Sequence, residues 1–140
     1  MSKGSTKAAY IAMEAWINED GTYIVHAKDG FITTESSTYE ELRESVREAV
    51  DFYLEDQPNA YNMSAGAPIR ISFTTVINPN LQGAAKVNAK VNRVGEQYTL
   101  KHPQLQPISA SSLEGLIEQL KGQVTKMGSL QAELLLEDEI

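Results

Sequence analysis

Two segments of the chain are built alike, and their spacing limits what the chain can fold into. Residues 36–50 read SSTYEELRESVREAV, and residues 110–124 read ASSLEGLIEQLKGQV. In each segment, hydroxyl-bearing residues precede an acidic residue and then apolar residues three and four positions apart, which predicts a capped amphipathic helix. We therefore expect one folding unit to occur twice.

The start of each helix can be assigned to single residues. Thr38 followed by Glu41 is typical of a capping box, in which the hydroxyl and the carboxylate each satisfy a backbone N–H of the first turn. Ser111 and Glu114 repeat this pattern in the second segment. The first helix is predicted to begin at Thr38 and to pack one apolar face on a sheet.

The residues around the first helix predict strands. Residues 10–17 alternate between two faces, and the outer face carries Tyr10, Ala12, Glu14 and Trp16. The turn NEDG and the run TYIVHAK predict a hairpin, and DG followed by FITTES predicts a third strand. With the strand IRISFTTVI after the helix, the first half has the order βββαβ.

The second half repeats this order in a weaker form. AAKVNAKVN alternates, and RVGEQYTLKH supplies a turn and a partner strand. PQLQPIS contains too much proline for a central strand, so any third strand here is expected to be short or at an edge. LQAELLL after the second helix predicts the last strand.

Adding one constant to the residue numbers of the first half aligns it with the second half from the first strand through the helix. We call this constant the repeat offset. It places Asn18 on Asn92, Gly21 on Gly95, Ser37 on Ser111, Glu40 on Glu114, Leu42 on Leu116 and Val50 on Val124. We predict an α+β fold of duplicated βββαβ units packed as one domain. The expected bounds are 8–78 for the first unit, 84–137 for a diverged ββ(β)αβ repeat, and 1–7 and 138–140 for flexible ends.

Composition excludes several classes of function. A chain of 140 residues with a net charge of −7 is large enough for one core and too acidic for a general phosphate-binding surface, so DNA binding is not expected. The absence of cysteine removes disulfides, thiolate metal sites and cysteine nucleophiles. No long apolar run precedes Glu14, so we expect no secretion signal or membrane span and a cytoplasmic protein.

Catalytic patterns are missing from the sequence. His26 and His102 do not have the spacing of a metal site, and the chain contains neither a glycine-rich phosphate loop nor a nucleophile elbow. We therefore predict no cofactor, no metal and no enzymatic activity.

The outer faces of the two leading strands differ in chemistry. Tyr10, Glu14 and Trp16 make the first partly aromatic, which is typical of a contact surface, and we predict that they bind a partner. The alternative is that the other repeat or the last strand covers this face. The second face, with Lys86, Asn88, Lys90 and Asn92, is typical of a solvated strand that resists aggregation.

The first half, roughly residues 9–55, resembles the HicB-like antitoxin family in NEDGTYIVHA and SSTYEELRESVREAVDFYLE. It departs from the family in the short KDGF connection and in Ser36, where the family has glycine. The resemblance implies a curtailed ribonuclease-H-like unit that binds and blocks a small RNA-cleaving toxin. The DNA-binding segment of many family members is not found here, so self-repression is not expected.

Three hypotheses follow. The first is a non-enzymatic, antitoxin-like binding protein of bacterial or phage type that engages and inhibits a partner protein, with a homo-oligomer expected from exposed strand edges. The second is a binder of an anionic or nucleotide-like ligand through the locally basic middle of the chain, at Arg70, Lys86, Lys90, Arg93 and His102. The third, a Mg²⁺-dependent nuclease, has only Glu14 as a well-placed acid.

Overall fold

The computed structural model describes residues 10–28, 30, 32–56, 63, 65–77, 85–128 and 130–140. In the first half, the elements are β1 (Ile11–Ile17), β2 (Tyr23–Ala27), β3 (Thr33–Ser36), α1 (Tyr39–Asp56) and β4 (Ile69–Ile77). In the second half, they are β5 (Ala85–Val94), β6 (Gln97–Leu100), β7 (Ile108–Ala110), α2 (Leu113–Met127) and β8 (Leu130–Glu139). The predicted mixed α and β composition is confirmed.

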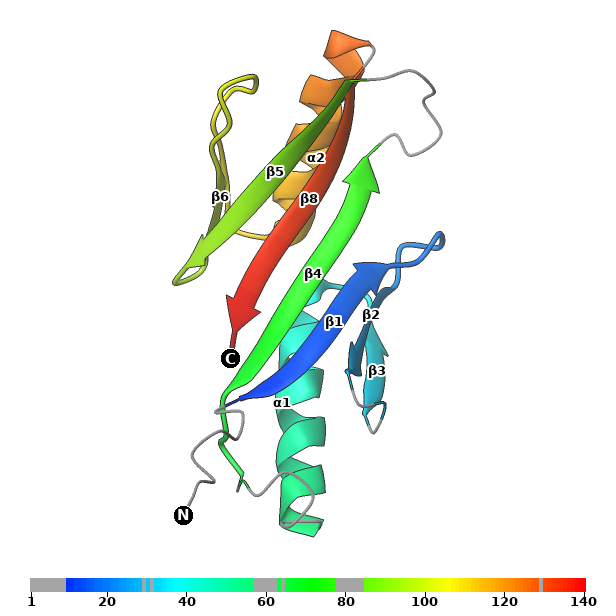
Figure 1. Cartoon of the computed structure of the whole chain (residues 1–140), viewed down its shortest axis with the longest axis vertical. Coiled ribbons are helices and arrows are strands. Elements are labelled where there is room, and N and C mark those ends of the chain that lie inside the picture. Colours follow the sequence, from blue (N-terminus) through cyan, green and yellow to red (C-terminus); the bar gives the residue numbers. More distant parts are fainter. Residues whose placement is uncertain are drawn as a thin grey trace, which may run out of the picture.

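The strands form one sheet in the order β3-β2-β1-β4-β8-β5-β6-β7, and Figure 1 shows both helices on the same side of it. Read outward from the centre, the two halves have the same arrangement. β1 is antiparallel to β2 and parallel to β4, and β5 is likewise antiparallel to β6 and parallel to β8. The halves join through the long antiparallel pair of β4 and β8, so the sheet continues from one half into the other.

The repeat offset describes the helices well and the second strands less well. It places the buried α1 residues Leu42, Val46 and Val50 on the buried α2 residues Leu116, Leu120 and Val124. In the strands, residues 18–22 close the first hairpin, whereas Gly95 and Glu96 alone close the second. The alternation of buried and exposed residues in β6 is therefore shifted by one residue relative to that in β2. As a result, the buried tyrosine that corresponds to Tyr23 is Tyr98. Common descent of the two halves stays a prediction.

The core lies between the sheet and the two helices. Alternate residues of β1 point to it, among them Ile11, Met13 and Ala15, and the alternate residues of β5 that do so include Val87, Ala89 and Val91. Burying a large aliphatic side chain contributes roughly 1.5–3 kcal/mol. The predicted inner and outer faces of both leading strands are thus correct, except that Ala85, predicted on the inner face, is exposed at the start of β5. The third strand of the second half, β7, is short and lies at an edge, as the prolines before it predict.

The helix caps differ from the prediction in detail. Thr38 Oγ1 accepts the Glu41 N–H at 3.2 Å, but the Glu41 carboxylate accepts the Thr38 and Ser37 hydroxyls instead of a backbone N–H. In α2 the cap is Ser112, whose Oγ accepts the Gly115 N–H at 3.0 Å. Assigning that cap to Ser111 was wrong, because Ser112 directly precedes the first helical residue.

Residues 138–140, expected to be a flexible end, continue the sheet. β8 reaches Glu139, and Ile140 exchanges two backbone hydrogen bonds with Ile69, at 2.9 and 3.2 Å. Asp138 is only 7% exposed. The acidic composition of residues 138–140 gave no indication that alternate residues of this stretch point toward the helices. Neither described helix is long and apolar enough to cross a membrane.

Candidate functional site

The sheet has one face that carries no helix, which we call the open face. It consists of the outward-pointing residues of β1, β2, β4, β8 and β5, and Figure 1 shows it toward the viewer. Among the described residues, neither the other repeat nor the last strand covers the β1 face, so the structure does not support that alternative. The second half extends the sheet edge to edge through β8 instead of stacking on it.

Three side chains near the end of β1 make a connected group, the Trp16 cluster, consisting of Glu14, Trp16 and His26. The rings of Trp16 and His26 meet edge to face with centroids 5.1 Å apart. His26 Nε2 lies 3.6 Å from Glu14 Oε2, and Glu14 and His26 are direct partners across β1 and β2. The Trp16 Nε1–H donates to Asn18 Oδ1 at 3.2 Å. These contacts hold the indole in place on the open face.

Tyr10, the third predicted contact residue, lies away from this cluster. Six residues of extended chain separate it from Trp16, a distance of about 20 Å. The Arg70 guanidinium lies over the Tyr10 ring, 4.1 Å from its centroid, and Arg70 Nε is 3.4 Å from Glu139 Oε2. The structure therefore brings Glu14 and Trp16 together with His26, and it places Tyr10 with Arg70 near the junction of the two halves.

The five residues of the alternative ligand site do not share one surface. Arg70, Lys86 and Lys90 belong to the open face, whereas Arg93 points to the helix side and His102 follows β6 in a loop. A hollow of about 380 Å³ on the open face is lined by Thr74, Asn88, Ala89, Lys90, Glu133 and Leu135. Lys86 Nζ pairs with Glu133 at 3.5 Å, so the carboxylate in this hollow partly neutralises the cations beside it.

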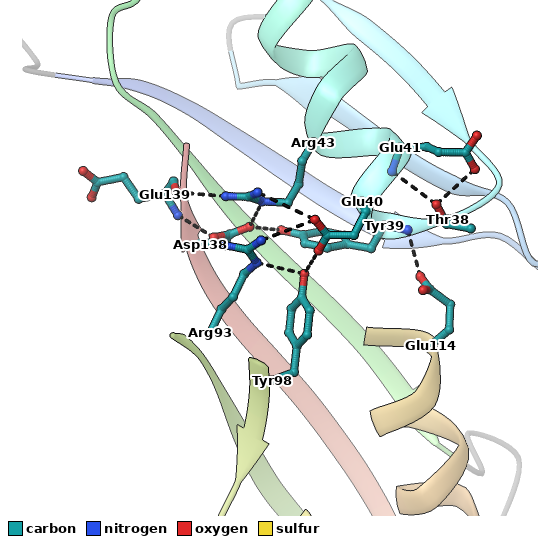
Figure 2. Close-up of polar contacts among 10 residues, drawn as sticks. All are labelled: Thr38, Tyr39, Glu40, Glu41, Arg43, Arg93, Tyr98, Glu114, Asp138 and Glu139. Carbon is teal, nitrogen blue, oxygen red and sulfur yellow. Dashed lines mark hydrogen bonds and ion pairs between the residues drawn. The ribbon is translucent and has the colours of Figure 1, made fainter. Parts of the chain in front are cut away.

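A polar junction lies between the halves on the helix side of the sheet, and Figure 2 shows its contacts. Asp138 of β8 accepts hydrogen bonds from the Tyr39 hydroxyl at 2.7 Å and from Arg43 Nε at 2.8 Å, both through Oδ2. Its Oδ1 accepts the Glu139 N–H at 2.8 Å. Burial raises the pKa of the Tyr39 phenol, and the Asp138 charge raises it further. The buried carboxylate is thus paired and fully hydrogen-bonded.

The junction continues through Glu40, which connects α1 to the second half. Its carboxylate accepts the Tyr98 hydroxyl and lies 3.3 Å from Arg93 Nη2. Arg93 Nε also donates to the Tyr98 hydroxyl at 3.0 Å. Burial raises the pKa of Tyr98, and the hydrogen bond to Glu40 adds to the increase. Arg93, predicted as a ligand-binding residue, is therefore engaged within the fold.

Glu114 of α2 makes the corresponding contact from the second half to the first. Its Oε2 accepts the Tyr39 N–H at the start of α1, at 2.8 Å. Burial raises the pKa of Tyr23, and the Glu114 charge and its hydrogen bond to the hydroxyl raise it further. The sequence contained one indication of this junction, because the repeat offset places Glu40 on Glu114. It did not indicate which residues these two glutamates contact.

Among the described residues, no group of three histidine or acidic side chains is arranged to hold a metal ion. The charged groups of the polar junction pair with one another, and the open face and its Trp16 cluster present side chains to the outside. Comparison of the chain with models of known protein families, with curated proteins and with solved structures finds no match.

Proposed function

We propose that this chain is a non-enzymatic, HicB-like binding protein of bacterial or phage type that engages and inhibits a partner protein through its open face. The observation that carries this proposal is the uncovered sheet face with an aromatic side chain held in place by the contacts of the Trp16 cluster. A side chain already fixed by its neighbours loses little conformational freedom on binding, which is the property of interface anchors.

The location of the cluster also favours binding. β1 has a strand on each side, so the Trp16 cluster is set within the sheet and not at its rim. Aromatic anchors at interfaces act best when neighbouring contacts exclude water around them. Ile24, the direct cross-strand partner of Trp16, provides apolar surroundings for this purpose.

The charge of this chain indicates which class of partner protein it would bind. β8 places Glu133, Glu137 and Glu139 on the open face, and the chain as a whole carries a net charge of −7. Proteins that bind RNA neutralise phosphates with lysine and arginine, so their active surfaces are cationic. The open face itself is mixed in charge, because Arg70 and Lys86 pair with Glu139 and Glu133 there. It is the net negative charge of the chain that complements such a surface, which agrees with the inhibition of an RNA-cleaving enzyme that the family resemblance implies.

Native mass spectrometry on the protein expressed with its genomic neighbours tests the proposal. We expect a second polypeptide in a fixed ratio, and we expect Trp16→Glu to abolish its retention. Met127→Glu is the matched control, because Met127 is 48% exposed and lies at the end of α2, away from the open face. A homo-oligomer that retains only a small molecule, or a partner equally retained by Trp16→Glu, would contradict the proposal.

A further inference from the structure

β3 forms one edge of the sheet, and among the described residues no strand lies beside its outward backbone groups. The Ala27 N–H donates to the Ile32 carbonyl at 2.8 Å, which fixes the hydrogen-bonding phase between β2 and β3. Hydrogen-bonded and non-hydrogen-bonded pairs alternate in an antiparallel ladder. The backbone N–H and C=O groups of Thr33 and Glu35 therefore point outward from the sheet, where another strand can pair with them.

A groove runs along this edge between β3 and α1. It has a volume of about 640 Å³ and is lined by Ile32, Thr33, Thr34, Ser45, Glu48, Ala49, Phe52 and Tyr53. Phe52 is 75% exposed, although it is one of the largest apolar side chains of α1. An added strand would cover the Phe52 ring and fill the groove, since alternate residues of that strand would point toward α1.

Near the opposite edge of the sheet, a helix side chain bonds the backbone beside the edge strand β7. Just before β7, the Gln106 N–H donates to Gln123 Oε1 and its carbonyl accepts Gln123 Nε2, each at 2.9 Å. Gln123 lies on α2, and the repeat offset places it on Ala49, which lines the open groove and has no group to make these bonds. One half thus satisfies the backbone beside its edge strand, and the other leaves a groove there.

Charge indicates what the open groove accepts. Glu48 is exposed on the groove wall, and Glu35 is exposed on β3 with its side chain toward the open face. In the part of the chain that the structure describes, neither carboxylate has an ion-pair or hydrogen-bond partner. A second copy of this chain would bring the same carboxylates against each other across the edge. Lysine or arginine on an incoming strand would instead neutralise them.

We propose that the β3 edge binds an extended segment of another protein by strand addition. Apolar side chains of this segment point toward α1 and pack against Ala49 and Phe52, and lysine or arginine side chains on its other face lie near Glu35. This site is distinct from the Trp16 cluster, so the proposal goes beyond the open-face function and does not depend on it. The required chemistry is an alternation of apolar and basic residues in an extended conformation.

The test uses the full chain labelled with ¹⁵N and a short capped peptide of alternating valine and lysine. We expect NMR shift changes at β3 and α1, and slower hydrogen exchange at the Thr33 and Glu35 amides because the peptide backbone now pairs with them. A peptide of alternating valine and glutamate, and a valine–lysine peptide N-methylated on its pairing edge, should both bind at least about tenfold more weakly.

Variants localise the effect. Ala49→Gln introduces the residue type that bonds the backbone beside the other edge and should weaken peptide binding by about tenfold, and Phe52→Lys should do so independently. Glu35→Gln should weaken binding and reduce its dependence on salt, whereas Glu118→Gln removes an exposed charge of α2 and should change neither. Trp16→Glu should leave peptide binding intact, which separates this site from the open face.

Four results of the peptide experiments would overturn the proposal. They are no shift changes with the valine–lysine peptide at millimolar concentration, equal binding of the N-methylated peptide, shift changes confined to the open face, and binding unaffected by both Ala49→Gln and Phe52→Lys. Sedimentation that showed concentration-dependent self-association, lost in Phe52→Lys, would also overturn it by making a second copy the occupant.

Discussion

Glu40 and Glu114 occupy the second positions of α1 and α2, and each carboxylate binds a tyrosine hydroxyl of the opposite half. Glu40 accepts from Tyr98 of β6, and Glu114 is the hydrogen-bond partner of Tyr23 of β2. The exchange makes each helix start depend on a strand of the other half. Together with the pairing of β4 and β8, it predicts that the two halves unfold as one unit.

Removing either glutamate should destabilise both halves together. Glu114→Ala leaves the Tyr39 N–H without its acceptor, and we expect the free energy of unfolding to fall by about 1–3 kcal/mol. Chemical denaturation followed by far-UV circular dichroism and by Trp16 fluorescence measures this change. Glu44→Ala is the control, since Glu44 is exposed on α1 outside the junction. Two separate transitions by the two probes would contradict the shared junction.

Asp138 should be among the most sensitive polar residues of the chain. Asp138→Ala leaves Arg43 without its closest carboxylate and the Tyr39 hydroxyl without its acceptor, so we expect a loss of about 3 kcal/mol. The neighbouring control is Glu137→Ala on the open face, which loses an exposed hydrogen bond to Ser72 and should cost less than about 1 kcal/mol. Equal losses for both variants would show that the buried pairing does not stabilise the fold.

Stability should decline in alkaline solution. The pKa values of Tyr23, Tyr39 and Tyr98 are raised in the folded protein, first by burial. An unfolded tyrosine loses its proton near pH 10, so the unfolded state gains charge first and stability falls as the pH rises above that value. Denaturation series from neutral to alkaline pH should show this slope, and Tyr39→Phe should reduce it. Stability that stayed level above pH 10 would contradict the raised pKa values.

Nucleotides should not stabilise the protein. The cations predicted for an anionic ligand are divided between two faces of the sheet, and Glu133 lies in the hollow beside Lys90. We therefore expect melting temperatures to stay constant across a panel of nucleotides and phosphates, measured by thermal shift at saturating concentrations. A concentration-dependent rise that disappears in Lys90→Gln would instead establish the ligand-binding alternative.

The sequence predicts the elements of this fold better than the contacts between them. Alternation in residues 10–17 and 84–92 assigned the inner and outer faces of β1 and β5, because one face of each strand is buried and the other is not. The proline-rich stretch before β7 correctly indicated an edge. The one-residue change of phase at Tyr98 was not predictable, since it depends on how tightly the second hairpin turns.

The contacts of the polar junction could not be predicted from the sequence, and the reason is physical. Arg93 and Lys90 are both cations of one strand, and only the continuation of β5 to Val94 turns Arg93 toward the helices. Asp138 sits in an acidic stretch whose composition is typical of a solvated end. Its burial follows from the pairing of β8 with β4, a contact between residues far apart in the chain.

The most direct test of the central claim uses the only tryptophan of the chain, Trp16, as its own reporter. Acrylamide quenching of its fluorescence is measured in the free protein and in the complex with the partner found by native mass spectrometry, using a tryptophan-free variant of that partner. The account predicts that the complex protects the indole, with quenching reduced several-fold and emission shifted to the blue. Quenching and emission unchanged in a saturated complex would show that the partner binds elsewhere and that the Trp16 cluster is not its site.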